Sequence, residues 1–121
     1  MTDLIAQSRR YLDAWQRKDA ALIATLIDDQ VTFKGPMVET RGREAFLGAV
    51  QRMFPLLKSL QVRHVYGGAD HVVAIYDFLC LEPIGLCRTA ELLGFKAALI
   101  RSRELFFDAR PFETLMRPPG R

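Results

Sequence analysis

The hydrophobic period of this chain changes once, near residue 60, and this change limits the folds open to it. Before that point, apolar residues recur three and four positions apart, as on one face of a helix. After it, they alternate or run continuously, as in the strands of a sheet. Helices first and strands afterwards predict an α+β domain in which helices pack on one face of a curved, mostly antiparallel sheet.

Three helices are predicted in the first half of the chain. Asp19 is placed to cap the second helix, which ends at Asp28, and the third begins after Gly42 and is stopped by Pro55. A short strand, residues 31–33, separates the second helix from the third. The first helix is predicted to be amphipathic, with a polar face opposite one stripe formed by Leu4, Ile5, Ser8, Tyr11, Leu12 and Trp15.

The second half predicts an antiparallel meander with strands at residues 60–66, 72–81, 86–93 and 97–107. Residues 72–81 are almost wholly apolar, which predicts a strand covered on both faces. The helices can cover only one face of the sheet. We therefore expect a homodimer that buries the other face, including Ile100, Ser102 and Phe106.

The length of 121 residues, with 50% hydrophobic residues, fits one domain, predicted at residues 1–116 with a flexible tail at 117–121. The 17 Lys and Arg are scattered, so no nucleic-acid partner is expected. With no apolar run long enough to span a bilayer, no membrane partner is expected, and the chain is interpreted as cytoplasmic. Cys80 and Cys87 lack zinc-ligand spacing and are expected to be free thiols, with no metal and no cofactor.

Four sequence motifs, taken in chain order, resemble those of a known family. They are residues 11–15 followed by Asp19, Asp28-Asp29 leading into residues 31–36, residues 41–46, and residues 105–112. In these the chain resembles the SnoaL-like branch of the nuclear transport factor 2-like superfamily, which includes ketosteroid isomerases, polyketide cyclases and limonene epoxide hydrolase. The resemblance implies a cone-shaped, cystatin-like α+β barrel around an apolar pocket. The same shell serves enzymes and non-catalytic modules alike, so the fold does not determine the function.

The resemblance also suggests site residues. In the isomerases, a first-helix Tyr and a late-strand acid donate hydrogen bonds to a developing oxyanion, and Tyr11 and Glu91 fall on or near those positions. Arg103 on the next strand is the expected partner of Glu91, which should keep Glu91 ionised. The pair is either structural or orients Arg103 toward a carbonyl or carboxylate. Because Gly35 stands where the isomerases hold their base, steroid isomerisation is disfavoured.

Two further titratable residues are candidates for the interior. Asp77 is the one charge in an apolar strand, so it either works in the pocket, pairs with an Arg or lies at a dimer seam. It could also match one acid of the epoxide hydrolase, but Leu105 stands where that enzyme's other acid would lie. His64 is predicted to share a face with Leu60, Val62 and Tyr66, and it is expected in the interior, as an acid or base or as a core residue.

Together these residues define the predicted site. Two functions stay open: a cofactor-free acid–base isomerase, cyclase or hydratase acting on a small, hydrophobic or partly polar organic molecule, or a non-catalytic ligand-binding or dimerisation module. The missing base at Gly35 favours the module. The catalytic candidates are Tyr11, Asp77, Glu91 and Arg103, and the ligand-binding candidates are Trp15, Phe33, His64 and Leu105.

Overall fold

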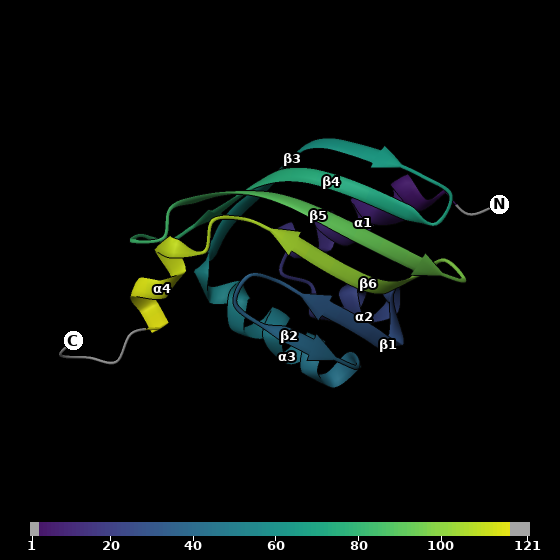
Figure 1. Cartoon of the computed structure of the whole chain (residues 1–121), viewed down its shortest axis with the longest axis horizontal. Coiled ribbons are helices and arrows are strands. Elements are labelled where there is room, and N and C mark those ends of the chain that lie inside the picture. The colour runs from purple at the N-terminus through teal and green to yellow at the C-terminus, as the bar shows by residue number, and fades with distance from the viewer. Residues whose placement is uncertain (1–2, 117–121) are drawn as a thin grey trace.

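The computed structural model describes residues 3–116, as a curved six-stranded sheet with helices on one side (Figure 1). We call the face toward these helices the inner face and the opposite one the outer face. None of the described helices has the length and hydrophobicity of a membrane-spanning segment. In chain order, the elements are α1 (Leu4–Gln16), α2 (Ala20–Leu26), β1 (Ile27–Lys34), β2 (Glu39–Arg41), α3 (Arg43–Met53), a 3-10 turn (Phe54–Leu56), β3 (Leu57–Gly67), β4 (His71–Cys80), β5 (Leu86–Lys96), β6 (Leu99–Phe106) and α4 (Arg110–Met116).

The sheet has the order β2-β1-β6-β5-β4-β3. Strands β3 to β6 form the predicted antiparallel meander, and β1 joins its far side by pairing in parallel with β6. The core lies between the inner face and α1 to α3. This arrangement confirms the α+β class and the three N-terminal helices.

Local sequence signals account for the helix starts. Asp3 caps α1 by accepting from the backbone N–H of Ala6, and Asp19 caps α2 by accepting from that of Leu22, at 3.1 and 3.0 Å. Helix α3 follows Gly42, whose φ of +87° favours glycine because a Cβ would strain the backbone there. The starts predicted for the second and third helices are therefore confirmed.

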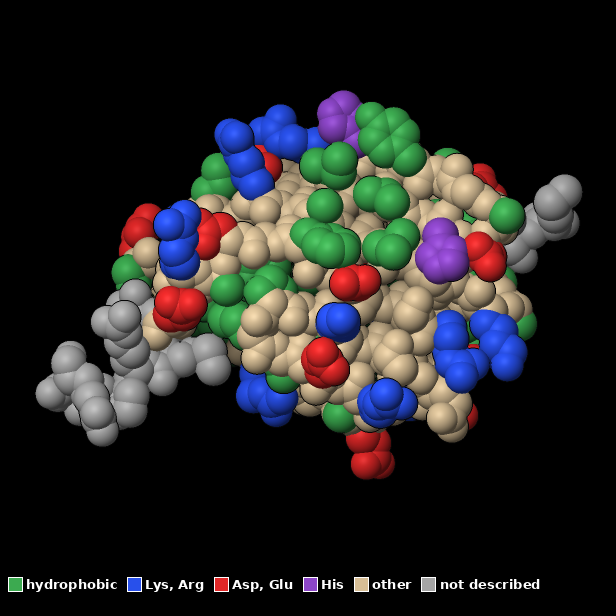
Figure 2. Space-filling view, viewed as in Figure 1, with side chains coloured by type: hydrophobic (Ala, Val, Ile, Leu, Met, Phe, Trp, Pro, Cys, Tyr) green, Lys and Arg blue, Asp and Glu red, His purple; other side chains and the backbone are tan. Residues whose placement is uncertain are grey.

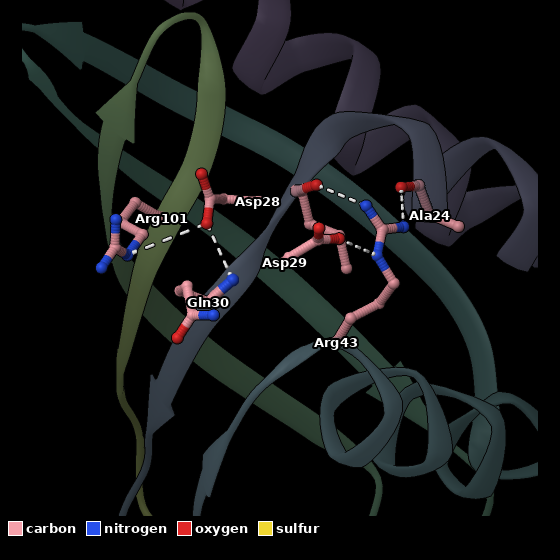
Figure 3. Close-up of polar contacts among 7 residues, drawn as sticks. Ala24, Asp28, Asp29, Gln30, Arg43 and Arg101 are labelled. Atoms are coloured by element: carbon pink, nitrogen blue, oxygen red, sulfur yellow. Dashed lines mark hydrogen bonds and ion pairs between the residues drawn. The ribbon is translucent and has the colours of Figure 1, made fainter.

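Arg43, the first residue of α3, ties three elements together (Figure 3). Its Nε donates to Asp29 Oδ1 of β1 at 2.9 Å, and its terminal nitrogens donate to the backbone carbonyls of Ala24 and Ile27. These carbonyls belong to the end of α2 and the start of β1. The motif residues Asp29 and Arg43 thus hold the α2–β1 corner against α3.

Helix α4 was not predicted, and it raises the number of described helices to four. Its second residue is Pro111, which a first helical turn tolerates because its missing N–H would have no helical partner there. The predicted tail, residues 117–121, lies outside the described residues.

The predicted position of His64 on the inner face is wrong, because β3 contains a β-bulge before it. Val62 pairs with Tyr76 but His64 pairs with Ile75, so β3 holds one more residue than β4 between these pairs. The extra residue, Arg63, reverses the alternation of side chains. His64 therefore lies on the outer face and is exposed, whereas the alternation predicted it on the inner one.

The prediction that Ile100 lies on the outer face is also wrong, because β6 contains a second β-bulge. Gly94 pairs with Ser102 and Phe95 with Ile100, which leaves Arg101 as the extra residue on β6. Ile100 consequently faces inward and is 1% exposed, so it cannot belong to an outer-face interface. Phe106 lies outward as predicted and is 51% exposed.

Candidate functional site

A cavity of about 110 Å³ lies between α3, the β1–β2 loop and the inner face of β4 to β6. Most of its lining is apolar, and its polar side chains come from three neighbouring strands: Tyr76 of β4, Thr89 of β5 and Arg103 of β6, with the Cys87 thiol beside them. The apolar lining residues are Trp15 of α1, Phe33 of β1, Pro36, Met37 and Val38 of the loop, Phe46, Ala49, Val50 and Met53 of α3, Phe78, Leu105, Phe107 and, on α4, Phe112.

A buried ion pair lies at one wall of the cavity. The Nε of Arg103 donates to Oε2 of Glu91, and the Tyr76 hydroxyl donates to Oε1 of the same carboxylate at 2.7 Å. The side chain of Glu91 is fully buried and that of Arg103 is 6% exposed. Both carboxylate oxygens are therefore hydrogen-bonded, as a buried charge requires.

The guanidinium of Arg103 lies among four aromatic rings. Its Cζ is 4.8 Å from the ring centroid of Phe33, 5.3 Å from that of Phe46, and 5.5 Å from those of Tyr11 and Trp15. Rings at this distance attract a cation through their quadrupoles. Although burial opposes the charge, Glu91 raises the pKa of Arg103 above its usual range. Arg103 is thus held in place as a permanent cation.

Two further donors lie near Arg103. The Tyr11 hydroxyl and the Trp15 indole N–H are enclosed by protein atoms and lie beside each other, and neither makes a hydrogen bond of ordinary geometry to a described residue. Burial raises the pKa of Tyr11 far above its usual range, so the hydroxyl keeps its proton. Trp15 lines the cavity, but Tyr11 contacts Arg103 without lining it.

Asp77 lies on the outer face, away from the cavity. It alternates along β4 with Tyr76 and Phe78, which both face inward. Its Oδ2 accepts from Arg63 Nε at 2.6 Å, and Arg88 is its neighbour on β5. The hydrogen bond from Arg63 lowers the pKa of Asp77 below its usual value. Asp77 is therefore paired with an arginine on the outer face, and it takes no part in the cavity.

The structure brings six of the eight predicted site residues together. Trp15, Phe33, Arg103 and Leu105 line the cavity. Tyr11 and Glu91 lie against Arg103 without lining it. Asp77 and His64 are separated from this group by the sheet. His64 instead stacks on Tyr66, with ring centroids 5.9 Å apart.

The predicted site lacks Tyr76, which supplies the second hydrogen bond to Glu91. Its neighbour Asp77 is the conspicuous charge of the strand, and consecutive residues of a strand point to opposite faces. A sequence prediction that put Asp77 on the outer face, beside an arginine, would have put Tyr76 on the inner face. Phe107 ends the predicted strand 97–107 and lines the cavity together with Phe112, which comes from beyond that strand, where no period indicates which element it joins.

The chemistry of the cavity is that of a hydrogen-bond donor site without a base. Among the described residues that line it, none is Asp, Glu, His or Lys. Burial raises the pKa of Tyr76 well above its usual value, and burial also raises that of the Cys87 thiol. In residues 3–116, no group of three or more His, Cys, Asp and Glu is arranged to hold a metal ion. Arg103 can donate hydrogen bonds to a molecule in the cavity, but none of the described lining side chains is suited to remove a proton.

Comparison with solved structures shows where this fold occurs. A protein from Kribbella flavida superposes with a TM-score of 0.85 at 21% identity, covering 93% of this chain and 92% of that one. An NTF2-like protein from Cytophaga hutchinsonii gives 0.82 at 18%, covering 93% and 96%. A Catenulispora acidiphila protein with a ketosteroid isomerase-like fold, in complex with trimethylamine, gives 0.76 at 17%, covering 87% of each chain. At these identities the likeness concerns the fold alone.

No curated protein sequence matches the chain. The model of the SnoaL-like domain family matches residues 8–92, which run from α1 into β5 and include Tyr11, Trp15, Phe33, Tyr76 and Glu91. Because this match spans more than half of the chain, and the fold agrees with it, the protein belongs to the SnoaL-like family.

Proposed function

We propose that this protein binds a small, mostly apolar organic molecule in the cavity and does so without acid–base catalysis. The observation that carries the proposal is the lining itself, in which aromatic and aliphatic side chains surround one charged donor, Arg103, and no base. Sites for small molecules are typically apolar, with few polar groups that fix the ligand's orientation. The non-catalytic alternative is thus preferred over the isomerase or cyclase.

The size of the cavity sets the scale of the ligand. Its volume of about 110 Å³ is somewhat smaller than that of apolar cavities that hold a benzene molecule, about 150 Å³. A ring molecule with no more heavy atoms than benzene, such as a five-membered ring with one exocyclic atom, is therefore a suitable probe. The structural relative in complex with trimethylamine supports a ligand of this order of size for the fold.

Catalysis is the second candidate, and one observation favours it. Arg103 is an immobile cation at the cavity wall, and such a group could polarise a carbonyl in an isomerisation or cyclisation. A substrate that carries its own base would be required. Binding comes first in either case, so the test below applies to both.

Trp15 makes binding directly measurable because it is the single tryptophan of the chain and lines the cavity. Titration with methylenecyclopentane or cyclopentanone should change its fluorescence saturably. Ala49→Phe should abolish the change by filling the cavity, whereas Ala45→Phe, on an exposed position of the same helix, should retain it. If neither probe binds and purified protein carries no small molecule by mass spectrometry, the proposed function is wrong.

We further propose that the protein works as a homodimer through its outer face. Figure 2 shows a cluster of hydrophobic side chains over β3 to β6. In it Tyr66 is 59%, Ile75 36% and Phe106 51% exposed. Cross-strand pairing of Tyr66 with Val73 and of Phe106 with Ala90 makes the cluster continuous. Apolar patches of this kind are typical of interfaces.

A further inference from the structure

We infer that the ligand is uncharged and carries a hydrogen-bond-accepting oxygen that Arg103 binds. This inference rests on the proposed function, because it specifies the head group of a molecule held in the same cavity. Its first support is the balance of donors and acceptors, and its second is the balance of charge.

The unpaired polar groups at the cavity are donors. The one hydrogen bond that Arg103 makes there uses Nε, so its terminal nitrogens have no acceptor among the described residues. The other polar lining groups are paired within the protein: the Tyr76 hydroxyl donates to Glu91, and that of Thr89 to the Cys87 carbonyl. A buried donor without an acceptor is costly, so the cavity favours a ligand that accepts.

Charge balance then selects among acceptors. Arg103 is already paired with Glu91, and no other Asp, Glu, Lys, Arg or His lines the cavity among the described residues. A carboxylate ligand would add a second negative charge close to Glu91 in an apolar enclosure, where charges interact strongly. An ammonium ligand would meet the fixed Arg103 cation. A ketone, ester or amide oxygen accepts the hydrogen bonds without disturbing the pair.

Four ligands with one ring and different head groups test this inference by calorimetry and Trp15 fluorescence. We expect cyclopentanone to bind about tenfold more tightly than methylenecyclopentane, which has the same shape but no acceptor. Cyclopentanecarboxylate and cyclopentylammonium should bind at least about tenfold more weakly than the ketone. Equal affinity for ketone and hydrocarbon, or a carboxylate bound as tightly as the ketone, would overturn the inference and leave the proposed function intact.

The variant Glu91→Gln tests whether the charge of Glu91 sets the preference for an uncharged ligand. The substitution leaves Arg103 without its counter-charge, so the cavity wall becomes cationic and cyclopentanecarboxylate should become the preferred ligand, raising the melting temperature of the variant. Asp77→Asn is the matched control because it removes a carboxylate from an arginine on the other face of the same sheet. The control should keep the wild-type preference for the ketone.

Loss of folding in Glu91→Gln would not remove the test. The double variant Glu91→Gln, Arg103→Met removes both charges and keeps side chains of similar length. It should bind cyclopentanone and methylenecyclopentane with affinities within about twofold of each other, since the charged donor is gone. A double variant that retains the full preference for the ketone would show that Arg103 does not bind the oxygen.

Discussion

Glu91 of β5 and Arg103 of β6 are diagonal neighbours in the sheet, since Arg103 pairs with Leu93, two residues along from Glu91. Long side chains reach across such a diagonal. The pair is closed off from water by the aromatic rings around Arg103 and by the Tyr76 hydroxyl. The polar wall of the cavity therefore depends on three strands keeping one register.

Removing one partner of this pair should be far more costly than removing both. In Glu91→Leu, Arg103 becomes a buried cation without a counter-ion, and we expect a loss of about 3–5 kcal/mol in the free energy of unfolding. Glu91→Leu, Arg103→Met should recover most of it. Urea unfolding followed by Trp15 fluorescence measures both, and a double variant no more stable than the single one would contradict this account.

That Glu91 and Arg103 share a face of the sheet could be predicted from the sequence, because alternation along the neighbouring strands at residues 86–93 and 97–107 puts both on the same side. The structure pairs the two residues, as this shared face predicts. Helix starts at Asp19 and Gly42 were predictable for a similar reason, since capping depends on residues within one turn.

The two bulges could not be predicted in this way. An extra residue such as Arg63 or Arg101 carries no distinctive signal, yet it reverses every side chain beyond it. This is why His64 and Ile100 lie on the opposite faces from those expected. The closing of the cavity by Phe112 depends on how α4 returns to the sheet, which hydrophobic period alone does not indicate.

The proposed dimer should dissociate when a charge is placed in the outer-face cluster. Ile75→Lys puts an ammonium in the middle of β4, where burial against a second copy would be costly. Ile5→Lys is the matched control, since Ile5 is 37% exposed on α1 and Ile75 is 36% exposed. Light scattering should give a dimer for wild type and control and a monomer for Ile75→Lys. A monomeric wild type would refute the dimer.

The ion pair of Asp77 with Arg63 should make stability depend on pH. The pKa of Asp77 in the folded chain is lowered below its ordinary value of 3.8, so the pair stabilises the fold above that pH. The stabilisation is lost as the pH falls through the folded pKa. Near neutral pH, the free energy of unfolding should therefore be larger for wild type than for Asp77→Asn. This difference should shrink as the solution is acidified, and also in high salt. A difference that grew on acidification would contradict the sign.

Both cysteines are free and buried, and they should react slowly in the folded protein. Burial raises the pKa of Cys80 to about 11, and burial likewise raises that of Cys87. Because the thiolate is the reactive form, a disulfide reagent at about pH 8 should label little protein before unfolding and two thiols per chain in denaturant. Cys87 lines the cavity, whereas Cys80 does not, so a bound ligand should slow the labelling of Cys87 more. Peptide mapping separates the two, and equal protection of both thiols would indicate that the ligand only stabilises the fold as a whole.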